Sequence, residues 1–137
     1  MPDMIPVEKL FTIRMEAGTP VVLRRGPQGT RGIVMVTGGS FEGPRLSGTV
    51  LPGGGEWATL RANRSAKADV RLLLETADGA HILMTYTGIS LDSAAKVRVA
   101  PLFETGDERY AWLNDVQGVG IGHMEGNVVT YDMYALL

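Results

Sequence analysis

Two short stretches decide the predicted fold: Gly53-Gly54-Gly55-Glu56-Trp57 and Ala68-Asp69-Val70-Arg71-Leu72-Leu73-Leu74-Glu75. The first is a glycine turn that delivers a carboxylate and an indole, because glycine adopts backbone conformations that other residues avoid. The second alternates as a β-strand does, with Val70, Leu72 and Leu74 on one face and Asp69 and Arg71 on the other. We therefore expect two adjoining strands here, and any chemical site beside them.

The rest of the chain repeats this pattern of short apolar runs separated by turns. It contains 18 glycines in 137 residues, about twice the average usage of roughly 7%. Strands are expected over residues 9–16, 21–23, 32–37, 46–51, 57–62, 69–75, 82–87, 97–103, 116–121 and 128–137. The run 32–37 is apolar throughout and predicts a strand buried on both sides. Only residues 107–114 suggest a helical turn or two.

These elements predict an all-β fold and one domain, residues 1–137. No segment has the helical pattern of about 10 to 12 residues that an α/β unit needs. So many strands must stack or close on themselves, because an open sheet leaves exposed edges. Sequential hairpins favour a single closed antiparallel barrel of about eight to ten strands with meander connections.

Composition narrows the classes of partner and cofactor. A net charge of −2 and scattered basic residues argue against nucleic-acid binding, which needs a basic patch. The absence of cysteine excludes disulfides and thiolate ligands, and His81 and His123 are isolated, so we expect no metal site and no cofactor. No apolar run reaches the roughly 20 residues of a membrane helix. Without a signal-peptide pattern, a cytoplasmic location is expected.

Six blocks of sequence also match a known family. In order they are residues 38–48 (GGSFEGPRLSG), 51–57 (LPGGGEW), 69–71 with 75–79 (DVR and ETADG), 101–106 (PLFETG), 109–114 (RYAWLN) and 131–134 (YDMY). The chain resembles the uncharacterised bacterial and fungal family catalogued as domain of unknown function 3237. The resemblance implies a barrel similar to that of allene oxide cyclase, a cup with a central cavity. It implies no particular reaction, because the family has no settled activity.

The candidate catalytic residues are Asp69, Arg71 and Glu56. If Asp69 and Arg71 face the barrel interior, Arg71 can anchor a carbonyl or carboxylate oxygen and Asp69 can serve as a general base. The alternative is an outward-facing salt bridge. Glu56 follows three glycines and precedes Trp57, whose apolar ring can raise the pKa of the carboxyl. The alternative there is a solvated loop acid. The resemblance adds a departure, since aspartate is commoner in the family at position 56.

Aromatic side chains with polar tips suit the rim of a pocket. The irregular segment 107–114 carries several, and the alternative for each is a place in the core. The candidate ligand-binding residues are Phe41, Trp57, Tyr86, Glu104, Tyr110, Trp112 and Asn114.

These residues favour a cofactor-independent enzyme of the lyase, isomerase or cyclase type. It would transfer a proton on an apolar or aromatic metabolite that carries a carbonyl or carboxylate. The alternative is a non-catalytic barrel that binds a hydrophobic small molecule. A third hypothesis is a homo-oligomeric scaffold paired through the apolar face of Val70, Leu72 and Leu74. No nucleic-acid or membrane partner is expected.

Overall fold

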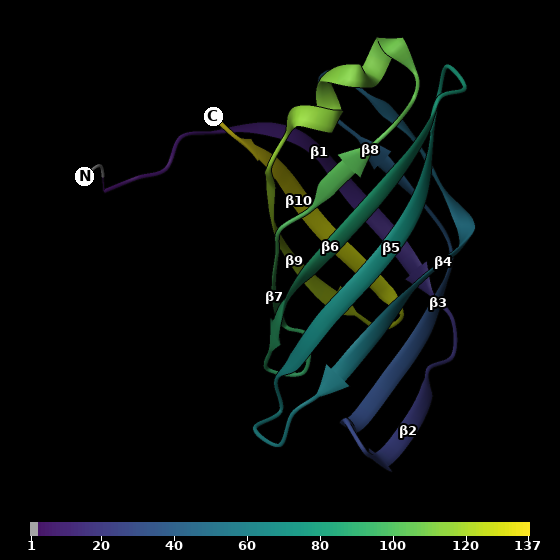
Figure 1. Cartoon of the computed structure of the whole chain (residues 1–137), viewed down its shortest axis with the longest axis vertical. Coiled ribbons are helices and arrows are strands. Elements are labelled where there is room, and N and C mark those ends of the chain that lie inside the picture. Colours follow the sequence, from purple (N-terminus) through teal and green to yellow (C-terminus); the bar gives the residue numbers. More distant parts are fainter. Residues whose placement is uncertain (1–2) are drawn as a thin grey trace.

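The computed structural model of the chain describes residues 3–137, which form a closed antiparallel β-barrel (Figure 1). The ring runs β1-β10-β9-β7-β6-β5-β4-β3 and closes where β3 pairs with β1. This confirms the predicted barrel. The strands are β1 (Val7–Ala17), β2 (Val21–Gly26), β3 (Gly29–Glu42), β4 (Ser47–Leu60), β5 (Ala66–Thr76), β6 (His81–Leu91), β7 (Lys96–Val99), β8 (Leu102–Glu104), β9 (Gly118–Glu125) and β10 (Val128–Leu136).

A single short helix covers one end of the barrel. It is the 3₁₀ helix η1 (Glu108–Asp115), which confirms the helical turns expected near residues 107–114. Asp107 caps it, since its side chain accepts a hydrogen bond of 2.9 Å from the backbone N–H of Arg109. Within residues 3–137, no helix has the length and apolar character needed to span a bilayer.

The core lies inside the barrel and draws side chains from most of its strands and from η1. Phe11 lies at its centre, with ring centroids 5.4 Å from Phe41 and 6.0 Å from Phe103. Each large apolar side chain buried in this way stabilises the fold by about 1.5–3 kcal/mol. The other fully buried large side chains are Ile13, Leu72, Leu74, Ile82, Met84, Pro101, Leu113 and Met133. Leu72 and Leu74 therefore face the core, as does Val70, and the predicted subunit-pairing face on these residues is wrong.

The glycine segment before Glu56 is a bulge within one long strand, and not the turn that the sequence predicted. β4 pairs Leu51 with Leu73 and then Gly55 with Arg71, so β4 holds more residues than β5 across this interval. Within this glycine segment Gly54 lies nearest to a neighbouring strand: a Cβ there would be 2.5 Å from the carbonyl oxygen of Arg71. Only glycine fits between the two backbones at this distance.

Two further strand predictions need correction. Residues 32–37 are not buried on both sides: Val36 faces the core, whereas Met35 is 44% exposed, because the outer face of the barrel has no covering layer. Residues 97–103 form two strands, β7 and β8. Pro101 lies between them and has no N–H with which to continue the ladder.

The β2–β3 hairpin extends beyond the ring. β2 pairs only with β3, and every residue of β2 is exposed. Figure 1 shows this hairpin at the end of the barrel opposite η1. The two ends therefore differ, one filled by core residues beneath η1 and the other bordered by loops.

Candidate active site

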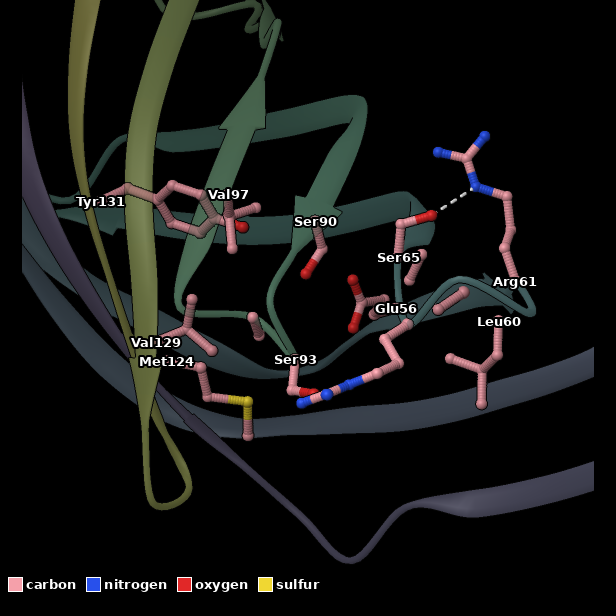
Figure 2. A pocket seen from close by; sticks show the side chains of 14 residues that line it. Glu56, Leu60, Arg61, Ser65, Ser90, Ser93, Val97, Met124, Val129 and Tyr131 are labelled. Atoms are coloured by element: carbon pink, nitrogen blue, oxygen red, sulfur yellow. Dashed lines mark hydrogen bonds between the residues drawn. The ribbon is translucent and has the colours of Figure 1, made fainter.

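A cavity of about 450 Å³ opens at the end of the barrel away from η1. Its size falls in the range of about 300–1,000 Å³ typical of small-molecule sites. It is bordered by the β4–β5 loop, the β6–β7 loop and the β9–β10 hairpin (Figure 2). The wall is mostly apolar, with Ala58, Leu60, Val97, Met124 and Val129. The polar lining consists of Glu56, Arg61, Arg64, Ser65, Ser90, Ser93 and Tyr131.

Glu56 is the carboxylate of this cavity. The bulge in β4 places it directly across from Val34 on β3 and Val70 on β5. Burial between these apolar neighbours raises the pKa of the Glu56 carboxyl above its ordinary value. Within residues 3–137, no basic side chain forms an ion pair with it. Glu56 can therefore hold a proton at a pH where an exposed glutamate has lost it.

Two tyrosines lie beside Glu56 inside the barrel. Tyr86 on β6 pairs with Val70 on β5. Its ring packs edge-on against the ring of Tyr131, with the two centroids 5.5 Å apart. Burial raises the pKa of both phenols, and the negative charge of Glu56 raises each further. Both hydroxyls therefore stay protonated and remain hydrogen-bond donors. The Tyr131 ring fits because its neighbour on β9 is Gly122, where a Cβ would lie 2.3 Å from the ring.

A second, smaller cavity of about 40 Å³ lies deeper in the barrel. Glu56, Val129 and Tyr131 line both cavities, whereas Tyr86 lines only the inner one. Glu56 and Tyr131 therefore stand between the two. A cavity needs about 10–15 Å³ of this kind of volume to hold a water with polar partners, so the inner cavity has room for one.

Asp69 and Arg71 take the outward orientation, which the sequence left open as the alternative, and so do not reach the cavity. Both side chains are exposed on the outer face of β5, because Val70 and Leu72 occupy its inner face. The period of two was predicted correctly, whereas the sequence left open which of the two faces points inward. Trp57 also points outward and is 37% exposed, since its neighbour Glu56 takes the inward position.

The other predicted ligand-binding residues lie away from the cavity, except Tyr86. Phe41 is in the core against Phe11. Tyr110 donates to the Asp78 carboxylate at 2.8 Å, which ties η1 to the β5–β6 turn at the filled end. The remaining three lie at the same end of the barrel. The Arg45 guanidinium stacks on the Trp112 ring, 3.6 Å from its centroid. Asn114 forms hydrogen bonds with the backbone of Thr105, and Glu104 is exposed on β8.

Sequence reasoning missed Tyr131 and the arginines of the β4–β5 loop. Tyr131 was recoverable, because the alternation over residues 128–137 places it on the same face as Met133. Arg61 and Arg64 carry no such signal, since a loop has no period. Among residues 3–137, histidine, aspartate and glutamate side chains nowhere gather in threes that could hold a metal ion.

Comparison with known proteins identifies the family of this barrel. Residues 5–136 match the family model described as "Protein of unknown function (DUF3237)". The chain belongs to that family. The DUF3237 barrel described here resembles a β-barrel-like protein from Acinetobacter baumannii AYE, with a TM-score of 0.92, 31% identity and coverage of 100% of this chain and 99% of that one.

The fungal matches to this DUF3237 chain are named as enzymes. The hydroalkoxylation enzyme PhnH of Penicillium herquei is 36% identical over 114 residues, which cover 83% of this chain and 72% of that protein. A solved structure of an enzyme from Penicillium herquei has a TM-score of 0.78 and 28% identity, covering 100% of this chain and 98% of that one. A distant homologue of this chain is thus an enzyme.

Proposed function

We propose that this chain is an enzyme that transfers a proton on an apolar or aromatic small molecule bound in the barrel mouth. Glu56 is its acid–base group, and the reaction is of the lyase, isomerase or cyclase type without a cofactor. The observation that carries this proposal is an unpaired carboxyl with a raised pKa at the inner end of a cavity of about 450 Å³. A general acid or base works best when its pKa lies near the operating pH.

The hydroxyl of Tyr131 supplies a second function at the same place. Because burial keeps this phenol protonated, it can donate a hydrogen bond to an oxygen that gains negative charge in the transition state. Tyr86 packs against the Tyr131 ring and holds it in position. The substrate accordingly carries a carbonyl or hydroxyl oxygen near the carbon that exchanges a proton.

The named reaction of the fungal relative supports this chemistry. A hydroalkoxylation adds an O–H group across a C=C bond, so one proton leaves oxygen and one proton joins carbon. A single carboxylate can take the first proton and its carboxylic acid form can deliver the second, which leaves the enzyme unchanged. Whether this chain adds, eliminates or isomerises depends on its own substrate, and the acid–base group is the same in each case.

An alkenyl phenol and a β-hydroxyketone test the proposal. 2-Allylphenol and 4-hydroxy-4-methyl-2-pentanone are incubated with the protein in D₂O, and deuterium in the recovered carbon skeleton is measured by mass spectrometry. We expect incorporation by the wild type and a loss of about 10²–10⁴-fold in Glu56→Gln, as is typical for removal of an acid–base group. Glu42→Gln, an exposed glutamate on β3 outside the cavity lining, is the matched control. Equal rates in wild type and Glu56→Gln would contradict the assignment.

A binding barrel without chemistry is the second candidate. Its support is the apolar wall of Val97, Met124 and Val129 around an open mouth, which can hold a hydrophobic ligand as other small barrels do. Tight binding of apolar molecules, with no deuterium in any of them and no effect of Glu56→Gln, is the outcome that favours it.

A further inference from the structure

The β4–β5 loop at the cavity mouth is tightly organised. The N–H of Arg61 donates to the carbonyl of Ser65 at 2.9 Å, and the N–H of Arg64 donates to the carbonyl of Arg61 at 3.2 Å. The Asn63 side chain accepts from both the backbone N–H and the hydroxyl of Ser65. Four residues therefore fix each other, and the loop presents its side chains from a defined backbone.

The two arginines of this loop have different environments. The Arg61 Nε donates to the Ser65 hydroxyl at 2.9 Å, and Figure 2 shows the rest of this side chain leading away from the cavity. Arg64 lines the cavity. Within residues 3–137, no carboxylate forms an ion pair with the Arg64 guanidinium. Arg61 thus braces the loop, and Arg64 brings a free positive charge to the mouth.

Arg64 occupies a backbone conformation that disfavours its own side chain. Its φ is +68°, in the left-handed region where a residue with a Cβ costs roughly 1–2 kcal/mol. Glycine or asparagine is usual there. Of the non-glycine residues with positive φ among residues 3–137, Arg64, Ser93 and Ala94 all line this cavity. Strain of this kind concentrates at binding sites, where a particular side chain is needed in spite of it.

Charge in the cavity is divided between its two ends. Arg64 is in the loop and Glu56 is on β4, four residues inward from Leu60 at the end of the strand. At about 3.3 Å per residue, these four residues span roughly 13 Å. The cavity wall is mostly apolar. The cavity therefore suits a molecule with an anionic group at one end, an apolar body and a reactive carbon at the other.

We propose that Arg64 is the anchor for a carboxylate on the substrate, which enters with its apolar body first and so brings its reactive end to Glu56. This inference rests on the proposed function, because it names the class of molecule on which Glu56 acts. A guanidinium pairs with a carboxylate through two parallel hydrogen bonds, which fixes orientation as well as position. The substrate class is an aromatic or polycyclic carboxylic acid.

Two probes of equal shape test the anchor. 2-Naphthoate and its neutral amide, 2-naphthamide, are titrated into the protein by calorimetry at low salt. We expect naphthoate to bind the wild type about tenfold more tightly, equivalent to about 1.4 kcal/mol. In Arg64→Gly this preference disappears while the naphthamide affinity is retained. Because glycine relieves the strain at this position, Arg64→Gly melts no lower than the wild type, so its loss of preference is not a loss of fold.

Arg25 offers a closely matched control. It is also an arginine with positive φ, +56°, but it lies in the β2–β3 hairpin and does not line the cavity. Arg25→Gly removes the same charge and the same strain, and we expect it to keep the full preference for naphthoate. Equal affinities of the two probes for the wild type, or an unchanged preference in Arg64→Gly, would overturn the anchor.

The two proposals fail in different ways. If Arg64→Gly keeps its naphthoate preference while Glu56→Gln loses deuterium incorporation, the anchor is refuted and the acid–base assignment stands. If Arg64→Gly loses the preference while Glu56→Gln keeps its activity, the anchor stands and Glu56 is not the acid–base group.

Discussion

Replacing Gly54 with alanine puts a methyl group at a point where the backbones of β4 and β5 lie close together. The new Cβ would lie 2.5 Å from the Arg71 carbonyl oxygen and 3.1 Å from the Leu72 Cα, and both are backbone atoms that no side-chain rotation can move away. Ordinary contact begins at 3.4 Å, so the two strands must separate by about 0.9 Å at this point. Overpacking of this kind costs about 1–3 kcal/mol.

The cost can be converted into a melting temperature. An unfolding entropy of about 2.1 cal/mol/K per residue gives about 0.29 kcal/mol/K for 137 residues. Gly54→Ala should therefore lower Tm by about 3–10 °C in a calorimetric scan. The strain also displaces Glu56, two residues along β4. A misplacement of about 1 Å can reduce the rate by about 10²-fold, and the deuterium incorporation assay measures this loss.

Gly38→Ala is the control for this substitution. A Cβ at Gly38 would meet only the Val50 carbonyl oxygen, at 4.0 Å. Its Tm should equal or exceed that of the wild type, because alanine reduces the entropy of the unfolded chain. A Gly54→Ala protein with the wild-type Tm and rate would show that β4 and β5 do not approach each other this closely, and that the bulge does not position Glu56.

Two further predictions concern the charged residues near this bulge. Burial raises the folded-state pKa of Glu56 above its ordinary value of 4.5, so folding takes up a proton between those two pKa values and the free energy of unfolding falls as pH rises through that window. Glu56→Gln should therefore be more stable than the wild type at neutral pH, and this advantage should shrink as pH falls through that window and be lost below pH 4.5. Urea unfolding at several pH values measures the advantage, and an advantage independent of pH would contradict the prediction. Asp69→Asn and Arg71→Met should each change stability by less than about 0.5 kcal/mol, as is usual for exposed positions, and leave deuterium incorporation intact, whereas a large loss in either would return the site to the outer face of β5.

The fold was largely predictable from the sequence because a barrel is built from local signals. Alternation over residues such as 69–75 and 82–87, with turns at Ala77-Asp78-Gly79 and Glu125-Gly126-Asn127, sets the strands and hairpins. The long bulge in β4 was not predictable, because Pro52-Gly53-Gly54-Gly55 has the composition of a turn. Its continuation as a strand depends on pairing with both β3 and β5, which are distant in sequence.

The site was predictable only in part. A period of two separates Asp69 and Arg71 from Val70 and Leu72, but it does not say which set faces inward. Burial decides this, since two more apolar side chains in the core outweigh a buried ion pair whose desolvation is costly. Glu56 was singled out as a candidate and does line the cavity. Its neighbour Tyr131 was not singled out, because 75 residues of sequence separate the two.

The closure of the ring links the first strand to the last. Val7 pairs with Leu136 and Glu16 with Val128, so the seam joins residues at opposite ends of the sequence. During synthesis on the ribosome, β3 is made soon after β1 and can pair with one edge of β1. The other edge of β1 stays unpaired until β10 is made. Folding that depends on such distant contacts is slow, and unpaired edges favour association with other chains. This barrel is therefore expected to need protection by chaperones until its last strand is made.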